Sequence, residues 1–362
     1  MKVVVDCRYT RFDQHDGISR YTAGLVTALA SLHPVTMLIN DPRQLALLPA
    51  LPWQRVSAPT SIREPLVAWQ VNRLRPDVVF SPMQTMGSWG RNYRLLLTVH
   101  DLIYYRNRTP PRNLPAAIRL LWRLYHLSWW PQRLLLNRAD GIVTVSETTR
   151  DLITQHTLTR RPVTVVFNAA NTVTDAAATA ARSRRAPETG RLVYMGSFMP
   201  YKNVDTLVRA VAQLPEHELH LMSRITPAER SRLKGLAPGA RLVFHDGVTD
   251  AEYLEVLASA TALVTASRDE GFGIPLVEAM SLGIPVIVSD IPIFREIGGA
   301  AALYASPERA TDYAAAVRRL GYPGEWARVA ERSLGEAQRF TWEASAVRLL
   351  RLLEETVSPP PL

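Results

Sequence analysis

The sequence has 362 residues, an apolar fraction of 47% and a formal net charge of +9 at pH 7. This length allows two domains with full hydrophobic cores, and the composition argues against an intrinsically disordered chain. A single cysteine, Cys7, excludes an internal disulfide and a cysteine-rich zinc site, and we expect it to fill space beside a buried strand.

The charge is unevenly distributed between the two halves. Residues 1–180 carry 21 Lys and Arg against 11 Asp and Glu, a balance of +10, whereas residues 181–362 carry 21 against 22, a balance of −1. The N-terminus, MKVVVDCRYT, has the pattern of a strand and lacks the basic and apolar regions of a secretory signal. No run of about 18 apolar residues is present, so we expect a cytoplasmic protein without a transmembrane helix.

The first half alternates strand-like and helix-like segments. We predict strands at 2–6, 35–39, 77–80, 95–99, 141–145 and 163–167. We predict helices at 18–32 and 66–74, and one long helical stretch at 113–137. Residues 49–65 are interrupted by prolines and predict irregular structure, and the alanine-rich, basic residues 171–188 predict a linker.

The pattern restarts after this linker. Strands are predicted at 192–195, 218–222, 241–244, 262–266 and 285–289, and helices at 203–214, 250–260, 275–282 and 341–356. The alternation predicts an α/β protein with two doubly wound, Rossmann-like domains, at 1–175 and 186–340. Residues 341–362 form a C-terminal helix and tail, which we expect to return to the first domain. A ligand is expected in the cleft between the domains, at the carboxyl ends of the strands.

The segment 267–290, SRDEGFGIPLVEAMSLGIPVIVSD, predicts a loop, a helix, a turn and a buried strand. Gly271 and Gly273 allow a tight bend before the helix. Glu270 precedes the helix and Glu278 lies one turn inside it. The free amides at the helix start, those of Leu276 and Val277, suit a diphosphate. The alternative is a tight turn that carries two acids on the surface.

Four further motifs precede this segment along the chain. They are DGISRY (16–21), TVHDL (98–102), VTVSE (143–147) and YMGSFMPYKN (194–203), followed by EGFGIPLVEAM (270–280). The set resembles the family 4 retaining glycosyltransferases of the GT-B fold, which carry an E-x7-E signature, and the resemblance covers nearly the whole chain. It implies a nucleoside-diphosphate sugar as donor.

The resemblance also implies a role for each motif residue. Glu278 would hold the donor ribose, and Glu270 would contact the donor sugar and act in catalysis. The donor sugar would also meet the backbone of Phe272, Gly273 and Ile274. The donor diphosphate would be bound by Gly17, Lys202, Leu276 and Val277.

Lys202 is the candidate catalytic cation, because a positive charge there can neutralise the leaving diphosphate. Many family members carry an arginine in this motif, where this chain has Ser197 and Tyr201. Arg20 or Arg268 could substitute for it, and the sequence leaves both open. By the same resemblance His100 would hydrogen-bond the donor sugar or the reacting oxygens, although a histidine at a strand end is often structural.

The mechanism that the family implies is front-face attack, in which the leaving phosphate takes the acceptor proton. No second acid accompanies Glu270 as a glycosidase-like nucleophile, and no DXD-like motif is present. We therefore expect no obligatory metal and no cofactor besides the nucleotide-sugar co-substrate. Mannose from GDP-mannose is our first choice of donor, and loops 223–228 and 244–249 are expected to select the base and the sugar.

A basic, aromatic-rich stretch lies in the N-terminal half. Between Arg91 and Arg138 there are nine arginines and one acid, Asp101. Residues 113–138 also carry tryptophans and leucines, which predict an interfacial anchor on an anionic membrane. The tryptophans concerned are Trp122, Trp129 and Trp130. Alternatively, these tryptophans pack in the domain core and the arginines are only solvated.

These patterns lead to one functional expectation. The protein would be a peripheral membrane hexosyltransferase at the inner face of the cell membrane, with a lipid-linked or glycan acceptor. No module for reading nucleic acid accompanies the basic charge, so no nucleic-acid partner is expected. Two alternatives stay open: a soluble nucleotide-sugar enzyme of the same fold, and a non-catalytic subunit that binds nucleotide sugars.

Overall fold

The computed structural model of this chain describes residues 1–110, 116–170 and 190–358. The chain divides into two compact units. Unit 1 contains Met1–Ala169 and Thr341–Leu362, and unit 2 contains Ala170–Phe340. The predicted linker at 171–188 and the predicted boundaries at 175 and 186 lie outside the described residues.

Unit 1 is built on a seven-stranded sheet with the order β3-β2-β1-β4-β5-β6-β7, in which every neighbouring pair is parallel. Its strands are β1 (Val3–Asp6), β2 (Val35–Ile39), β3 (Trp53–Arg55), β4 (Val78–Ser81), β5 (Arg94–Val99), β6 (Gly141–Thr144) and β7 (Val163–Val165). Its α-helices are α1 (Gly17–Ala30), α2 (Val67–Asn72), α3 (Ile103–Arg106), α4 (Ala116–Tyr125), α5 (Trp130–Leu136), α6 (Glu147–Gln155) and α15 (Trp342–Val357). Short 3-10 helices span Pro42–Leu47 and Glu64–Leu66.

Unit 2 repeats this design with a six-stranded parallel sheet of order β10-β9-β8-β11-β12-β13. Its strands are β8 (Arg191–Tyr194), β9 (Glu218–Leu221), β10 (Leu242–Phe244), β11 (Ala262–Thr265), β12 (Val286–Ser289) and β13 (Leu303–Ala305). Its α-helices are α8 (Val204–Val211), α9 (Pro227–Leu236), α10 (Asp250–Ala258), α11 (Ile274–Ser281), α12 (Pro292–Gly298), α13 (Ala310–Leu320) and α14 (Glu325–Ala337). A 3-10 helix spans Pro200–Lys202.

The central strands are buried on both faces, which explains their continuous apolar sequences. In β1, Val3, Val4 and Val5 are at most 1% exposed. Cys7 directly follows this strand and is fully buried, as expected for a residue that fills space, and burial raises the pKa of its thiol. The prediction of two doubly wound, Rossmann-like units is therefore confirmed.

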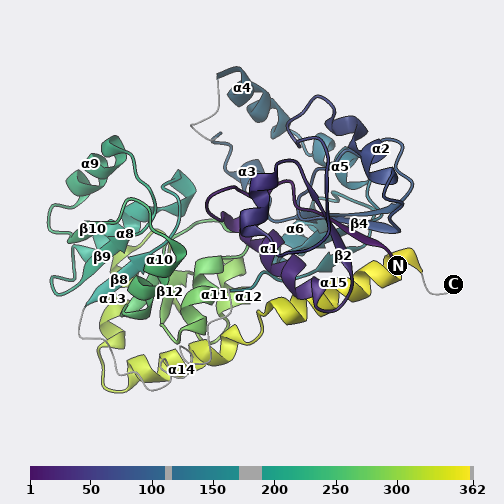
Figure 1. The fold of residues 1–362 in the computed structure, drawn as a ribbon. Coiled ribbons are helices and arrows are strands. Elements are labelled where there is room, and N and C mark those ends of the chain that lie inside the picture. Colours follow the sequence, from purple (N-terminus) through teal and green to yellow (C-terminus); the bar gives the residue numbers. More distant parts are fainter. Residues whose placement is uncertain (111–115, 171–189, 359–362) are drawn as a thin grey trace. The chain divides into compact units, whose positions relative to one another are not determined.

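The C-terminal helix returns to the first unit, as the sequence predicts. Figure 1 shows α15, in yellow, running beside α1, in purple. Trp342, at the start of α15, packs against Gly24 of α1 so closely that a Cβ on this glycine would overlap the indole ring. Residue 24 therefore has to be a glycine for the two helices to approach this closely.

The single helical stretch predicted at 113–137 is wrong. In the described part of this stretch, α4 ends at Tyr125 and α5 begins at Trp130, and residues 113–115 lie outside the description. Pro131 explains the break, because proline is accepted in a first helical turn but not in a helix interior. The irregular structure predicted at 49–65 also needs correction, since β3 lies there at the edge of the sheet.

Candidate active site

The sheet order of unit 2 brings two distant motifs together. The chain runs outward from β8 to β9 and β10 and then returns to β11, on the other side of β8. Ligands of doubly wound sheets bind at such a switch point, beyond the carboxyl ends of the strands. The segment after β8 carries Lys202, and the segment after β11 carries Glu270. Their side chains form an ion pair of 2.6 Å between Nζ and Oε1, although 68 residues separate them.

Local hydrogen bonds hold the Lys202 segment against β11. Asn203 adopts left-handed backbone angles, with φ of 52°, and ends the 3-10 helix that contains Lys202. Its side-chain amide donates to the carbonyls of Ala266, at 3.1 Å, and Pro307, at 2.6 Å. The amide of Arg268 donates to the carbonyl of Tyr201 at 2.8 Å. The lysine is thus positioned by the backbone around it.

The Lys202–Glu270 pair is largely shielded from water, with side-chain exposures of 17% and 13%. Charge-assisted hydrogen bonds in such surroundings are stronger than exposed ones. In this state Glu270 neutralises the ammonium group, so an anionic ligand would compete with Glu270 for it. The alternative of two surface acids is wrong, because Glu278 is also buried, at 5% exposure.

The helix that follows Glu270 begins as the sequence predicts. Gly273 precedes α11 with φ of 97°, a conformation that favours glycine. Phe272 is buried, and its ring packs edge-on against Phe340 with a centroid distance of 5.6 Å. The amide of Leu276 donates to the Gly273 carbonyl at 2.9 Å, so the expectation that this amide is free is wrong. The side chains of Leu276 and Val277 are buried. The first turn of α11, which has Gly273 as its N-cap and begins with Ile274, thus follows Glu270 closely in the chain.

The two arginines proposed to replace the missing one lie in different surroundings. Arg268 forms a 2.6 Å ion pair with Glu308 and also donates to the carbonyl of Pro200. Its charge is therefore close to the Lys202 segment but is compensated by Glu308. Arg20 lies in α1 of unit 1. Neither position identifies a second cation for the diphosphate.

Unit 1 places Gly17 at a helix start beside its own switch point. There the chain leaves β1 for β2 and β3 and returns to β4. Gly17 is the exposed first residue of α1, and Asp16 caps the helix by accepting from the Ser19 amide at 2.9 Å. The positive end of the α1 dipole therefore lies at Gly17, which suits an anion on physical grounds.

His100 follows β5 and is oriented by its neighbours. Its Nε2 lies 2.7 Å from the Pro82 carbonyl, which can only accept, so Nε2 carries the proton. The ring meets that of Tyr21 edge-on at 5.0 Å. Burial lowers the pKa of His100, so the ring is neutral and Nδ1 is left as an acceptor. This geometry suits acceptance of a hydrogen bond from a hydroxyl group.

A cavity of about 140 Å³ lies beside His100 in unit 1. Asp101, Gln84, Tyr104 and His126 contribute to its lining. The motif TVHDL contains His100 and Asp101, but the other three residues come from segments in which the sequence shows no motif. The cavity is large enough for a small polar group such as part of a sugar.

The tryptophans predicted to enter a membrane are not all at the surface. Trp122 packs against His126 at 4.1 Å, and Trp129 stacks on Tyr105 at 3.9 Å between ring centroids. The rings of these two residues are engaged within unit 1, which favours the alternative of packing in the domain, and their role as membrane anchors stays a prediction. Trp130, in contrast, is 66% exposed.

The described residues show neither a metal site nor a membrane-spanning helix. They contain no group of three His, Cys, Asp or Glu residues placed to hold a metal ion. The expectation that no metal is required stays a prediction. Within the same described ranges, no helix is both long and apolar enough to cross a bilayer.

Comparisons with known proteins match both units. Residues 15–173 match the family model Glycosyltransferase Family 4, and residues 189–321 match the model Glycosyl transferases group 1. The O-antigen chain mannosyltransferase RfbU of Salmonella typhimurium is 23% identical over 84% of this chain and 87% of its own length. The serotype-specific mannosyltransferase WbdA of Escherichia coli is 37% identical over 31% of this chain, but that match spans only 14% of WbdA.

Solved structures agree with the fold. Sucrose-phosphate synthase from Thermosynechococcus elongatus matches with a TM-score of 0.73 and 22% identity, over 99% of this chain and 100% of that one. Anabaena Alr3699/HepE, solved with UDP and glucose, matches with a TM-score of 0.69 and 18% identity, over 98% and 100%. The chain is therefore a hexosyltransferase of the GT-B fold, with its first part similar to the Glycosyltransferase Family 4 model and its second part similar to the Glycosyl transferases group 1 model.

Proposed function

We propose that this enzyme transfers mannose, with retention of anomeric configuration, from a nucleoside-diphosphate donor to a lipid-linked or glycan acceptor at a membrane. The observation that carries the proposal is the shielded Lys202–Glu270 pair at the switch point of unit 2. The names of RfbU and WbdA support mannose as the sugar. The UDP bound by HepE supports a nucleotide sugar as the partner class.

In the proposed complex the donor diphosphate lies at the start of α11 and replaces Glu270 as the ion-pair partner of the Lys202 ammonium group. The helix dipole and the ammonium group would then stabilise negative charge as it develops on the leaving phosphate. Glu270 is released to accept hydrogen bonds from the donor sugar, while Glu278 binds the ribose.

The proposed reaction balances without a cofactor or a metal ion. The acceptor hydroxyl oxygen forms a bond to the anomeric carbon on the face from which the diphosphate departs. The bond between the anomeric carbon and the phosphate oxygen breaks, and the leaving phosphate takes the hydroxyl proton. His100, neutral and with Nδ1 as an acceptor, would orient a hydroxyl group of the donor sugar or of the acceptor.

The test is Lys202→Ala, measured by release of the nucleoside diphosphate. Loss of a preorganised charge at the leaving group should lower kcat by about 100-fold or more. Lys234→Ala is the matched control, because Lys234 lies on α9 in the same unit, outside this site. Glu270→Ala should also lower transfer, and unchanged transfer in both site variants would exclude the proposed roles.

A panel of GDP-sugars and UDP-sugars, read by thermal shift, identifies the donor. A ligand that binds only the folded state raises the unfolding temperature more as its affinity increases. GDP-mannose should give the largest shift with the wild type. A larger shift with a UDP-sugar would overturn the choice of donor without affecting the roles of Lys202 and Glu270. Binding without any transfer would favour a non-catalytic subunit.

A further inference from the structure

Unit 1 carries a concentration of exposed apolar side chains on α4, α5 and the turn between them. We call this set the apolar face. Its members are between 46% and 66% exposed: Ile118, Leu120, Leu121, Leu124, Leu127, Trp130 and Leu134. A surface helix normally turns polar residues to the solvent. Here the aromatic rings of Trp122 and Trp129 pack inward and leucines face outward, so the face indicates a binding surface.

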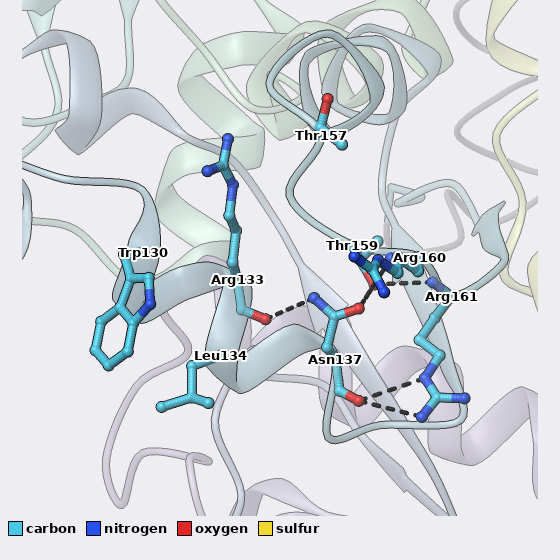
Figure 2. A pocket seen from close by; sticks show the side chains of 8 residues that line it. All are labelled: Trp130, Arg133, Leu134, Asn137, Thr157, Thr159, Arg160 and Arg161. Atoms are coloured by element: carbon cyan, nitrogen blue, oxygen red, sulfur yellow. Dashed lines mark hydrogen bonds between the residues drawn. The ribbon is translucent and has the colours of Figure 1, made fainter.

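A groove of about 790 Å³ adjoins one end of this face. Figure 2 shows its lining, which comes from α5 and from the loop before β7. We call it the arginine groove, after its three basic residues, Arg133, Arg160 and Arg161. Trp130 and Leu134 line this groove and are also members of the apolar face.

The groove is organised around Asn137. Its side-chain amide donates to the Arg133 carbonyl at 2.7 Å, and its side-chain oxygen accepts from the Arg160 amide at 2.9 Å. Its backbone carbonyl accepts from the guanidinium group of Arg161 at 3.3 Å (Figure 2). Asn137 therefore ties the end of α5 to the loop that carries the two other arginines.

The positive charge of the groove is not compensated nearby. Its lining contains no acid, and among the described residues none of its three arginines pairs with a carboxylate. Guanidinium groups match phosphate geometry and are weakly hydrated, which favours phosphate as a ligand. The exposed Arg123 on α4 adds a further positive charge beside the leucines.

We propose that the apolar face and the arginine groove together form a docking site for the surface of an anionic phospholipid bilayer. The leucines enter the boundary of the acyl chains, Trp130 lies at the level of the headgroups, and the three arginines bind lipid phosphates. A second copy of this chain fits less well, because it would bring an equally basic groove. The inference rests on the proposed transfer at a membrane and names the surface that makes contact.

The test is flotation of the full chain with vesicles of phosphatidylcholine, with and without phosphatidylglycerol. Leu121→Ser combined with Leu124→Ser should weaken binding to the mixed vesicles by at least about tenfold, because two inserted side chains are lost. The control is Ile62→Ser, which removes an apolar side chain that is 97% exposed in the same unit but outside the face. It should bind like the wild type.

The charge of the groove is tested separately. Arg160→Gln combined with Arg161→Gln should weaken binding to the phosphatidylglycerol vesicles by roughly 25-fold, at about 1 kcal/mol for each arginine near an anionic surface. The control, Arg63→Gln combined with Arg73→Gln, removes the same charge from exposed positions elsewhere in unit 1. An equal loss in this control would mean that net charge alone determines binding to the vesicles, and it would overturn the role of the groove.

Three further outcomes would overturn the proposal. They are a wild type that does not float with anionic vesicles, a leucine variant that floats as well as the wild type, and a wild-type dimer that the leucine variant converts to a monomer. Thermal shift with the nucleotide sugar checks that each variant is folded. Because flotation does not depend on transfer, failure of this inference is distinguishable from failure of the proposed function.

Discussion

At the scale of single residues, Gly273 shows how the backbone sets the start of α11. Its φ of 97° is reached easily only by glycine, and an added Cβ would lie 3.0 Å from the Phe294 ring. Gly273→Ala should therefore lower the free energy of unfolding of unit 2 by about 1–2 kcal/mol, measured by urea denaturation and hydrogen exchange. Affinity for the donor should fall as well, because the residue joins Glu270 to the first turn.

Gly235 provides the matched control for this substitution. It lies near the end of α9, and an added Cβ would have no neighbour within 4 Å. Gly235→Ala should be neutral or stabilise by up to about 1 kcal/mol, because alanine loses less entropy in a helix. Equal destabilisation by both substitutions would show that the strain at Gly273 is not the cause.

How far the sequence predicts single residues depends on whether their partners are local. The motif around Glu270 predicts the helix start, because glycine, proline and helix-forming residues act within one turn. The ion pair of Glu270 with Lys202 is not predictable from local pattern, since the strand order creates it. The pair of Arg8 with Glu64 in unit 1 is likewise not predictable, because 56 residues separate the two. Arg8 also pairs with Asp6, which is local.

At the scale of elements, α15 illustrates stabilisation by a helix that is remote in sequence. Trp342 is 6% exposed and packs on Gly24 and on Tyr21, whose ring lies 6.1 Å away. Trp342→Ala should destabilise the docking of α15 by about 3–5 kcal/mol, as expected for a large aromatic side chain. Hydrogen exchange should then accelerate in both α1 and α15.

Val347→Ala is the control on the same helix, because Val347 is 48% exposed. It should change the exchange rates in α1 very little. If Trp342→Ala also left these rates unchanged, the close approach of the two helices would contribute nothing measurable to the stability of unit 1.

Elements were predicted best where their pattern was long or periodic. The central strands are continuous apolar runs, and their prediction needed no knowledge of the fold. The sequence does not predict the break between α4 and α5, because the leucines and tryptophans keep a helical spacing across it. The spacing alone does not reveal which of these side chains face inward. In the structure, the leucines rather than Trp122 and Trp129 form the exposed surface.

At the scale of the whole molecule, the histidines should make stability depend on pH. Burial is the main cause that lowers the pKa in five of them: His100, His126, His217, His220 and His245. Each stays neutral in the folded chain at a pH where the unfolded chain, with a pKa near 6.5, already binds a proton. Unfolding then takes up protons, so stability must fall as the pH drops below about 6.5.

We therefore expect the thermal midpoint to be constant from pH 8 to about 7 and to decrease from about 6.5 downward, toward each folded-state pKa. Carboxylates titrate near pH 4 and do not account for a decrease that begins this early. The pair formed by His220 and His245, whose nitrogens lie 2.9 Å apart, allows a specific test. Gln at both positions cannot take up a proton, so the double variant should flatten the decrease. A midpoint that rises on acidification would contradict the sign of the argument, since it requires folded-state pKa values above 6.5.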